Sequence, residues 1–265
     1  MTATKGQLIS KFNLQVEALT SLDAAVTMKL TAGSAYTGVI EQYHEVDGFV
    51  LAQRPSSVRV IGQAPVVAKN IFDMVSNGEA FQIFIPSKNK FIVGSVNLER
   101  PAKKPIEILR PQHLIDAILW PAIAEGVPVL FEEASEATSR YYVLTVVRPA
   151  NDASTTNRTA SATIDWEIAR KIWFNRTDLN IARIQSYDPD GRVASDVQCG
   201  SWTAFGASSY PKQITLTRPA DDYELRIGIK RLSENEPIPA DRFVLEQPPG
   251  TEMVRVGEEP EEPRP

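Results

Sequence analysis

The fold is decided by residues 51–63, LAQRPSSVRVIGQ, together with residues 69–94, KNIFDMVSNGEAFQIFIPSKNKFIVG. Apolar and polar residues alternate along much of both segments, which is the pattern of half-buried β-strands. Asn77-Gly78 separates two of the apolar runs, and this dipeptide readily takes the positive φ angles of a tight hairpin turn. The stretch therefore predicts four consecutive antiparallel strands connected by turns.

The same patterns extend over the rest of the chain. Apolar residues at helical spacing predict one helix near the start, and a shorter one after Pro111. The first stripe is Leu8, Ile9, Phe12, Val16, Leu19 and Leu22, and the second is Leu114, Ile115, Ile118 and Leu119. From Ala24 the period changes to two, which predicts strands up to the end of the chain. Later strands are expected at residues 127–133, 140–148, 162–175, 179–188, 192–200, 212–219, 223–232 and 241–247.

The order of these features resembles that of the periplasmic outer-membrane lipoprotein carrier and receptor family (LolA/LolB-like lipoprotein-sorting proteins). The resemblance covers residues 7–94 and the end of the chain, and is architectural in between. It is carried by the amphipathic helix before the first strand, the strand that ends in Arg54-Pro55, the segment DMVSNGEAFQIFIPSKNKF at residues 73–91, and Phe243 followed by Pro248-Pro249-Gly250.

The resemblance implies a mainly β (α+β) fold. It consists of a single, strongly curved antiparallel sheet, an incomplete β-barrel of about eleven strands, with helices covering the concave face. A chain of 265 residues with 43% hydrophobic residues can form one such domain. We expect a single lipoprotein-carrier-like domain over residues 1–256 and a disordered acidic, Pro-rich tail, GEEPEEPRP, over residues 257–265. The small polar residues 149–161 indicate a mobile hairpin tip.

Composition argues against several classes of protein. The net charge of -5 disfavours binding to nucleic acid, which relies on clustered Lys and Arg. The single cysteine, Cys199, excludes an intramolecular disulfide and a multi-cysteine metal site. The most apolar stretch, residues 117–131, is interrupted by Pro121, Glu125 and Pro128, so we expect no transmembrane segment. No metal or cofactor is predicted.

Enzymatic function is not expected. The two histidines, His44 and His113, lie in no recognisable nucleophile context, and no G-x-S-x-G motif is present. Asp188-Pro189-Asp190-Gly191 resembles the start of a calcium loop, but Cys199 stands where that loop needs a bidentate Glu. We interpret it as a hairpin turn, and no catalytic residue is predicted.

Alternation also predicts the side chains that line a lipid-binding cavity. An ordinary core beneath a helix is the alternative for the same residues. The predicted lining is Phe49, Leu51, Val58, Val60, Phe72, Met74, Phe81, Ile83 and Ile85 from the strands, with Leu114 and Ile118 from the second helix. The resemblance further implies that Arg54 holds the helical lid by hydrogen-bonding helix carbonyls; an exposed strand-end arginine is the alternative, and Arg59 is a nearby competitor.

The hypothesis from sequence is a non-enzymatic carrier of lipoprotein acyl chains or another lipid, acting in sorting to the outer membrane. A structural or sensory envelope module on the same fold is the alternative, and a secreted hydrolase with two carboxylates across a cleft is a third. The resemblance implies a periplasmic and monomeric protein, with envelope transport proteins as further candidate partners. It leaves open an anchor through a lipidated N-terminal Cys that this sequence lacks.

Overall fold

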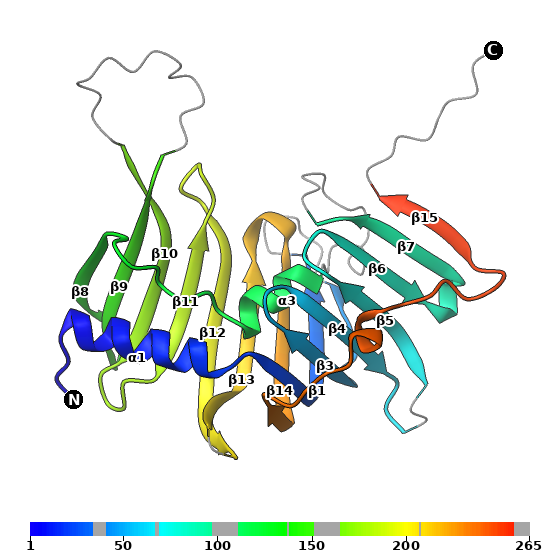
Figure 1. Cartoon of the computed structure of the whole chain (residues 1–265), viewed down its shortest axis with the longest axis horizontal. Helices are drawn as coiled ribbons and strands as arrows, with labels where there is room; N and C mark the ends of the chain where they lie inside the picture. The colour runs from blue at the N-terminus through cyan, green and yellow to red at the C-terminus, as the bar shows by residue number, and fades with distance from the viewer. Residues whose placement is uncertain are drawn as a thin grey trace, which may run out of the picture.

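The computed structural model describes residues 1–33, 41–66, 69–96, 111–136, 138–150, 165–206 and 208–256. These residues form one open, curved sheet with two α-helices on its concave face (Figure 1). The strand order is β15-β7-β6-β5-β4-β3-β1-β14-β13-β12-β11-β10-β9-β8, and the short β2 pairs with β1 outside this path. Within the described residues the edge strands β15 and β8 do not pair with each other, so the sheet is an incomplete barrel.

Most of the described elements are strands. The helices are α1 (Lys5–Ala18) and α3 (Pro111–Ile118), and short 3₁₀ turns are η1 (Pro86–Lys88), η2 (Pro219–Asp221) and η3 (Ala240–Phe243). The strands of the first half of the chain are β1 (Ser21–Ala32), β2 (Glu41–Gln42), β3 (Val46–Gln53), β4 (Ser57–Gln63), β5 (Asn70–Ser76), β6 (Ala80–Ile85) and β7 (Lys90–Ser95). Those of the second half are β8 (Val129–Glu136), β9 (Ser139–Pro149), β10 (Trp166–Asn175), β11 (Ile181–Tyr187), β12 (Val193–Phe205), β13 (Ser208–Arg218), β14 (Tyr223–Glu234) and β15 (Glu252–Val256).

Strand β1 joins the two halves of the sheet. It pairs with β3, the first strand of one antiparallel meander, and with β14, the last strand of the other. The chain then returns to the first half, where β15 pairs with β7 in parallel. The curved sheet expected from the sequence is thus confirmed, but about eleven strands was too few, because fourteen lie along the path.

Two local predictions are corrected. Residues 241–247 do not form a strand: η3 ends there and the last strand begins only at Glu252, after Pro248-Pro249, which cannot donate to a ladder. At the turn between β5 and β6 only Gly78 has a positive φ, of 94°. Asn77 instead closes the turn with its side chain, whose Oδ1 accepts the backbone N–H groups of Glu79 and Ala80.

Helix α1 begins at a capping box. The Thr4 side chain accepts the N–H of Gln7, and the Gln7 side chain accepts the N–H of Thr4. Leu8, Phe12 and Val16, each four residues apart, are the buried stripe. The helix lies across β8 to β12 (Figure 1). The predicted stripe was two residues too long, because Leu19 is the C-cap residue and Leu22 belongs to β1.

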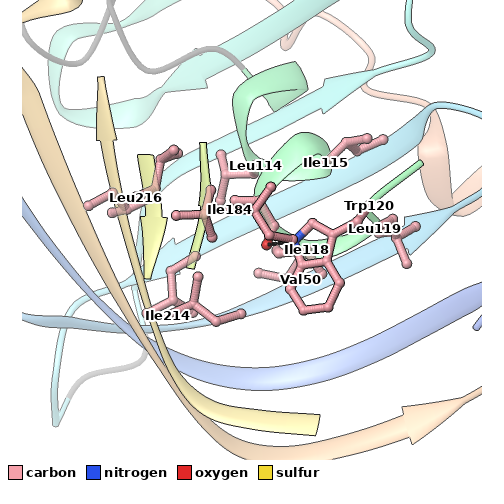
Figure 2. Close-up of a cluster of buried hydrophobic side chains, with 14 of the residues drawn as sticks. Val50, Leu114, Ile115, Ile118, Leu119, Trp120, Ile184, Ile214 and Leu216 are labelled. Atoms are coloured by element: carbon pink, nitrogen blue, oxygen red, sulfur yellow. Dashed lines mark hydrogen bonds between the residues drawn. The ribbon is translucent and has the colours of Figure 1, made fainter. Parts of the chain in front are cut away.

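Helix α3 covers the centre of the concave face. Its buried residues meet strand residues from both halves of the sheet, and together they form the central part of one hydrophobic core (Figure 2). The residues labelled there are Val50, Leu114, Ile115, Ile118, Leu119, Trp120, Ile184, Ile214 and Leu216.

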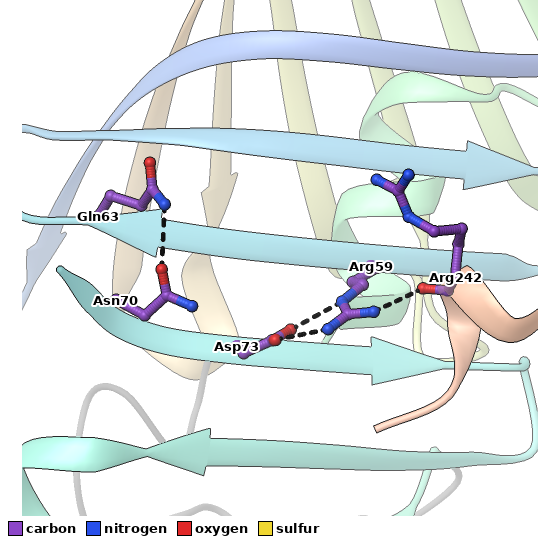
Figure 3. A network of polar contacts seen from close by, with 5 residues as sticks. All are labelled: Arg59, Gln63, Asn70, Asp73 and Arg242. Atoms are coloured by element: carbon purple, nitrogen blue, oxygen red, sulfur yellow. Dashed lines mark hydrogen bonds and ion pairs between the residues drawn. The ribbon is translucent and has the colours of Figure 1, made fainter. Parts of the chain in front are cut away.

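The convex face of the first half is covered as well. The Arg59 guanidinium forms a two-point ion pair with Asp73, at 2.7 and 3.0 Å, and donates to the carbonyl of Arg242 at 2.9 Å (Figure 3). Arg242 lies in η3, so this contact ties the C-terminal segment to β4 and β5. Arg59 is therefore engaged here and does not take the role expected of Arg54.

Some predictions fall outside the described residues. These are the greater part of the hairpin tip at residues 149–161 and the tail at residues 257–265. Neither helix among the described residues combines the length and apolar character needed to cross a bilayer.

Candidate functional site

A pocket of about 310 Å³ lies on the concave side, between the C-terminal half of α1 and strands β12 to β14. Its floor is apolar and is contributed by both helical regions and β12. Polar side chains stand at its margin. The residues that line it are Lys11, Leu14, Gln15, Val16, Ala18, Leu19, Arg54, Ile118, Trp120, Asn180, Trp202, Ser208, Ser209, Tyr210 and Glu234.

Trp120 is the centre of the floor. Its ring lies 6.5 Å from that of Phe12, 6.3 Å from that of Tyr210 and 6.5 Å from that of Trp202, all between ring centroids. The indole N–H donates to the carbonyl of Ala117 at 3.0 Å, so the ring offers the pocket its apolar surface. The hydroxyl of Tyr210 donates to the carbonyl of Ile118 at 2.7 Å, and burial raises the pKa of this phenol well above its ordinary value. Tyr210 therefore remains a neutral donor.

Arg54 connects the C-terminal ends of both helices. Its Nε donates to the carbonyl of Leu19 at 3.0 Å, and its Nη2 donates to those of Val16 at 3.2 Å and Trp120 at 2.8 Å. A guanidinium suits this place because it carries several fixed donors and a positive charge, which the C-terminal end of a helix favours. Burial lowers the pKa of Arg54. The predicted contact with helix-end carbonyls is present, whereas the lid-holding role remains a prediction.

The segment that follows α3, residues 119–128 and called the connecting segment below, runs along α1 toward β8 (Figure 1). The Asn13 side chain donates to the carbonyl of Ile123 at 2.8 Å and accepts its N–H at 2.9 Å. Arg170, on β10, donates to the carbonyl of Pro121 at 2.7 Å and lies 5.2 Å from the Phe12 ring centroid. Burial lowers the pKa of Arg170 to about 10. Asn13 of α1, Arg170 of β10 and Arg54 therefore hold the connecting segment in place.

The end of α1 has a second attachment at the turn after β14. Asn235, with a φ of 57°, donates from its side chain to the carbonyl of Ala18 at 2.7 Å. Its Oδ1 accepts the backbone N–H and the hydroxyl of Thr20 at 2.8 and 2.9 Å. The C-terminal end of α1 is thus held by Arg54 and Asn235, next to the pocket.

The predicted lipid-binding lining is found mostly elsewhere. Only Ile118, of that list, lines the pocket, and Arg54 lies at its margin. A further eight of the predicted residues form core buried against the helices, which is the alternative considered for them from sequence. They are Val58, Val60, Phe72, Met74, Phe81, Ile83, Ile85 and Leu114.

Phe49 and Leu51 do not share a face with the rest. Val50 pairs with Val60, so Val50 and Ala52 are the concave-facing residues of β3. Phe49 is 36% exposed, and Leu51 pairs with Arg59 on the convex face. The prediction that they line a common wall with Val58 was wrong. Both faces of β3 are apolar, so alternation could not indicate which one is concave.

Sequence reasoning missed most of the pocket. Trp202 and Tyr210 lie on β12 and β13, which extend beyond the strands expected at residues 192–200 and 212–219. The first of these expected strands stopped at Gly200 and the second began after Pro211. In the structure both residues are paired within the ladder, Gly200 with Gln213 and Pro211 with Trp202. The available signal for the pocket was Trp202, a large apolar side chain just beyond the expected end of the first of these strands.

The hydrolase alternative requires two carboxylates that face each other across a cleft. Glu234 is the one carboxylate among the described residues that line the pocket, so no pair of carboxylates faces across it. Within the described part of the chain no group of three or more His, Cys, Asp or Glu residues could hold a metal ion. The Asp188 loop is a turn, closed by a bond from the Arg192 N–H to the Asp188 carboxylate at 2.8 Å, as expected.

The reactivity of the Cys199 thiol can be tested directly. Burial raises the pKa of this thiol, so the thiolate is scarce near neutral pH. We expect alkylation by iodoacetamide in mildly alkaline buffer to be slow in the folded protein and fast after unfolding in guanidinium chloride, measured by intact mass. Alkylation of the folded protein at the rate of a free thiol peptide would contradict this.

Comparison with solved structures defines the class of fold. A LolA superfamily protein from Nitrosomonas europaea is 14% identical, with 92% of this chain and 99% of that chain covered and a TM-score of 0.51. A DUF1329 family protein from Desulfovibrio piger is 11% identical, with 89% and 94% covered and a TM-score of 0.54. A domain assigned to outer-membrane lipoprotein sorting, from Vibrio parahaemolyticus, is 9% identical, with 89% and 94% covered and a TM-score of 0.51.

No protein-family model matches the chain, and no curated protein sequence matches it significantly. The likeness is therefore one of fold, extending over nearly the whole length of both chains. The resemblance to LolA/LolB-like proteins inferred from the sequence is confirmed at that level.

Proposed function

We propose that the protein is a non-enzymatic carrier that binds lipoprotein acyl chains or another lipid on the concave side of its sheet. The observation that carries the proposal is the pocket beneath the end of α1, whose floor of Trp120, Val16 and Leu19 is apolar. Apolar clefts with a few polar groups at the margin are the usual form of small-ligand sites. A pocket of about 310 Å³ holds part of an acyl chain, and displacement of the helices provides the remainder.

The cover of the concave face supports this proposal. Apart from loops, α1, α3 and the connecting segment are all that cover the apolar side of the described sheet. They are fastened by side-chain bonds to backbone carbonyls, from Arg54, Arg170 and Asn235. Such bonds break and re-form without covalent change, so an acyl chain can replace helix side chains against the sheet.

The resemblance in fold to lipoprotein-sorting proteins extends the proposal to the cell envelope. The Vibrio parahaemolyticus domain is assigned to outer-membrane lipoprotein sorting. By analogy we propose that the protein acts in the periplasm as a monomer and exchanges its cargo with envelope transport proteins. Residues 1–256 would form its single carrier domain. Fold analogy alone carries this part.

A structural or sensory envelope module is the second candidate. It is favoured by one observation: the concave face under α3 is filled by the protein's own side chains, with Met74 and Ile83 fully buried. Such a module would bind a partner protein and leave this core unchanged. Lipid binding distinguishes the two candidates.

We expect a fluorescent fatty-acid probe to bind saturably, and solvent extracts of the purified protein to contain lipid. Replacing Trp202, which lines the pocket, by Gln should weaken probe binding at least about tenfold, which corresponds to about 1.4 kcal/mol. The matched control is Trp166→Gln, because Trp166 is 49% exposed and lies outside this pocket. Absence of saturable binding together with clean extracts would reject the carrier and favour the sensory module.

A further inference from the structure

Glu234, which lines the pocket, has a side-chain oxygen to which no described residue donates. Oε1 of Glu234 is buried, and it has no hydrogen-bond partner within the part of the chain that the structure describes. Glu234 is the last residue of β14 and lines the pocket with Arg54 and Tyr210. A buried carboxylate oxygen without a donor is costly, because it has lost water and gained nothing in return.

Several of the donors around the pocket are already engaged. The Tyr210 hydroxyl donates to the Ile118 carbonyl, and the Trp202 indole donates to the Ile181 carbonyl at 2.9 Å. Nε and Nη2 of Arg54 donate to helix carbonyls, and the side-chain N–H of Asn235 donates to Ala18. Lys11, Gln15, Ser208 and Ser209 also line the pocket. Oε1 of Glu234 bonds to none of them, so an occupant of the pocket can supply its donor.

We propose that Glu234 selects the head group of the bound amphiphile, and that this head group carries a nitrogen with hydrogens, an ammonium or an amide. This inference rests on the proposed function and specifies its ligand. The apolar floor beside Trp120 takes the hydrocarbon, and Glu234 accepts the N–H bond at the margin. A carboxylate or phosphate head group would bring a second negative charge to an acceptor that has no donor. Lys11, a half-buried residue of α1, also lines the pocket. Its positive charge opposes this effect, because it would favour an anionic head group.

The test compares four amphiphiles with the same alkyl chain: dodecylamine, N-dodecylacetamide, dodecanol and dodecanoic acid. Each competes with the fluorescent fatty-acid probe for the full chain, at neutral pH and below its micelle concentration. Dodecylamine and N-dodecylacetamide are expected to bind at least about tenfold more tightly than dodecanoic acid. The two nitrogen compounds distinguish an ammonium from an amide head group.

Glu234→Gln should reduce the preference for dodecylamine over dodecanoic acid to about twofold or less, because it removes the charge and keeps the shape. The control is Glu236→Gln, which makes the same change of charge at an exposed residue that does not line the pocket. The control should keep the wild-type preference. The unfolding midpoint of Glu234→Gln should be equal to or above that of wild type, since an unpaired buried charge has been removed.

The outcomes separate this inference from the proposed function. If dodecanol binds but the wild-type protein shows no preference among head groups, or prefers dodecanoic acid, the role of Glu234 is wrong and the carrier function stands. An unchanged preference in Glu234→Gln overturns it equally. If none of the four compounds displaces the probe and the probe itself does not bind, both proposals fail.

Discussion

Replacement of Met74 by Glu is expected to destabilise the protein by about 3–5 kcal/mol, the cost of an uncompensated buried charge. Met74 is fully buried on β5, between Val60 and Ile83 on the concave face. A glutamate there has no donor to pair with and must either carry its charge into the core or be protonated. Since domains are stable by about 5–15 kcal/mol, the change removes much of the total. Urea unfolding followed by circular dichroism measures it.

Two variants serve as controls for Met74→Glu. Met74→Leu conserves the volume and should cost less than about 1.5 kcal/mol. Phe49→Glu makes the same kind of change on the opposite face, at a residue that is 36% exposed, and should cost about 1 kcal/mol or less. Equal loss of stability in Met74→Glu and Phe49→Glu would show that the assignment of faces is wrong.

Replacement of Arg54 by Met is expected to loosen both helices and to speed ligand entry. The methionine keeps much of the apolar stem but removes the donors to Val16, Leu19 and Trp120. Each carbonyl left unpaired costs about 1–3 kcal/mol if it stays buried, so the closed arrangement should lose about 2 kcal/mol overall after discounting for partial solvent access. This shifts the population toward open forms. We expect at least about tenfold faster amide exchange across residues 112–119 and in the last turn of α1.

The rate at which the fatty-acid probe associates should rise in parallel with exchange. Arg54→Lys keeps the charge but donates from a single nitrogen. Its amide exchange and probe association rates should therefore lie between those of wild type and Arg54→Met. Arg148→Met is the matched control, because Arg148 makes a surface ion pair with Glu167 at 3.3 Å, away from the pocket. If Arg54→Met exchanges and associates like wild type, Arg54 is only a structural strand-end arginine.

The secondary structure was largely predictable because it depends on local periodicity. The alternation in residues 57–60 corresponds residue by residue to the burial of β4, and the stripes of α1 and α3 were read correctly apart from their ends. The contact of Arg54 with helix carbonyls was anticipated from the resemblance to LolA/LolB-like proteins, because the residue precedes Pro55 at the end of a strand. The strand and helix patterns, in contrast, depend on residues close together in the chain, where spacing fixes direction.

The location of the pocket was not predictable in this way. Its walls combine Val16 of α1, Arg54, Trp120 and residues of β12 to β14, and Glu234 of β14 lies more than 200 residues from Val16 along the chain. Their proximity follows from the pairing of β14 with β1, which places Glu234 opposite Leu22. Strands this far apart in the sequence are brought together by the packing of the whole sheet, and no local sequence pattern predicts which of them pair.

Local periodicity was enough to predict antiparallel strands with one helix before them and another among them, and the curvature of the sheet was inferred from the resemblance to LolA/LolB-like proteins. Periodicity could not establish which face of β3 is concave, because both faces carry apolar residues, Phe49 and Leu51 on one and Val50 and Ala52 on the other. Nor could it establish that Glu234 is buried without a donor, since burial of that oxygen results from elements brought together by the sheet. Periodicity specifies which residues share a side of a strand, whereas the environment of each side is created by distant parts of the chain.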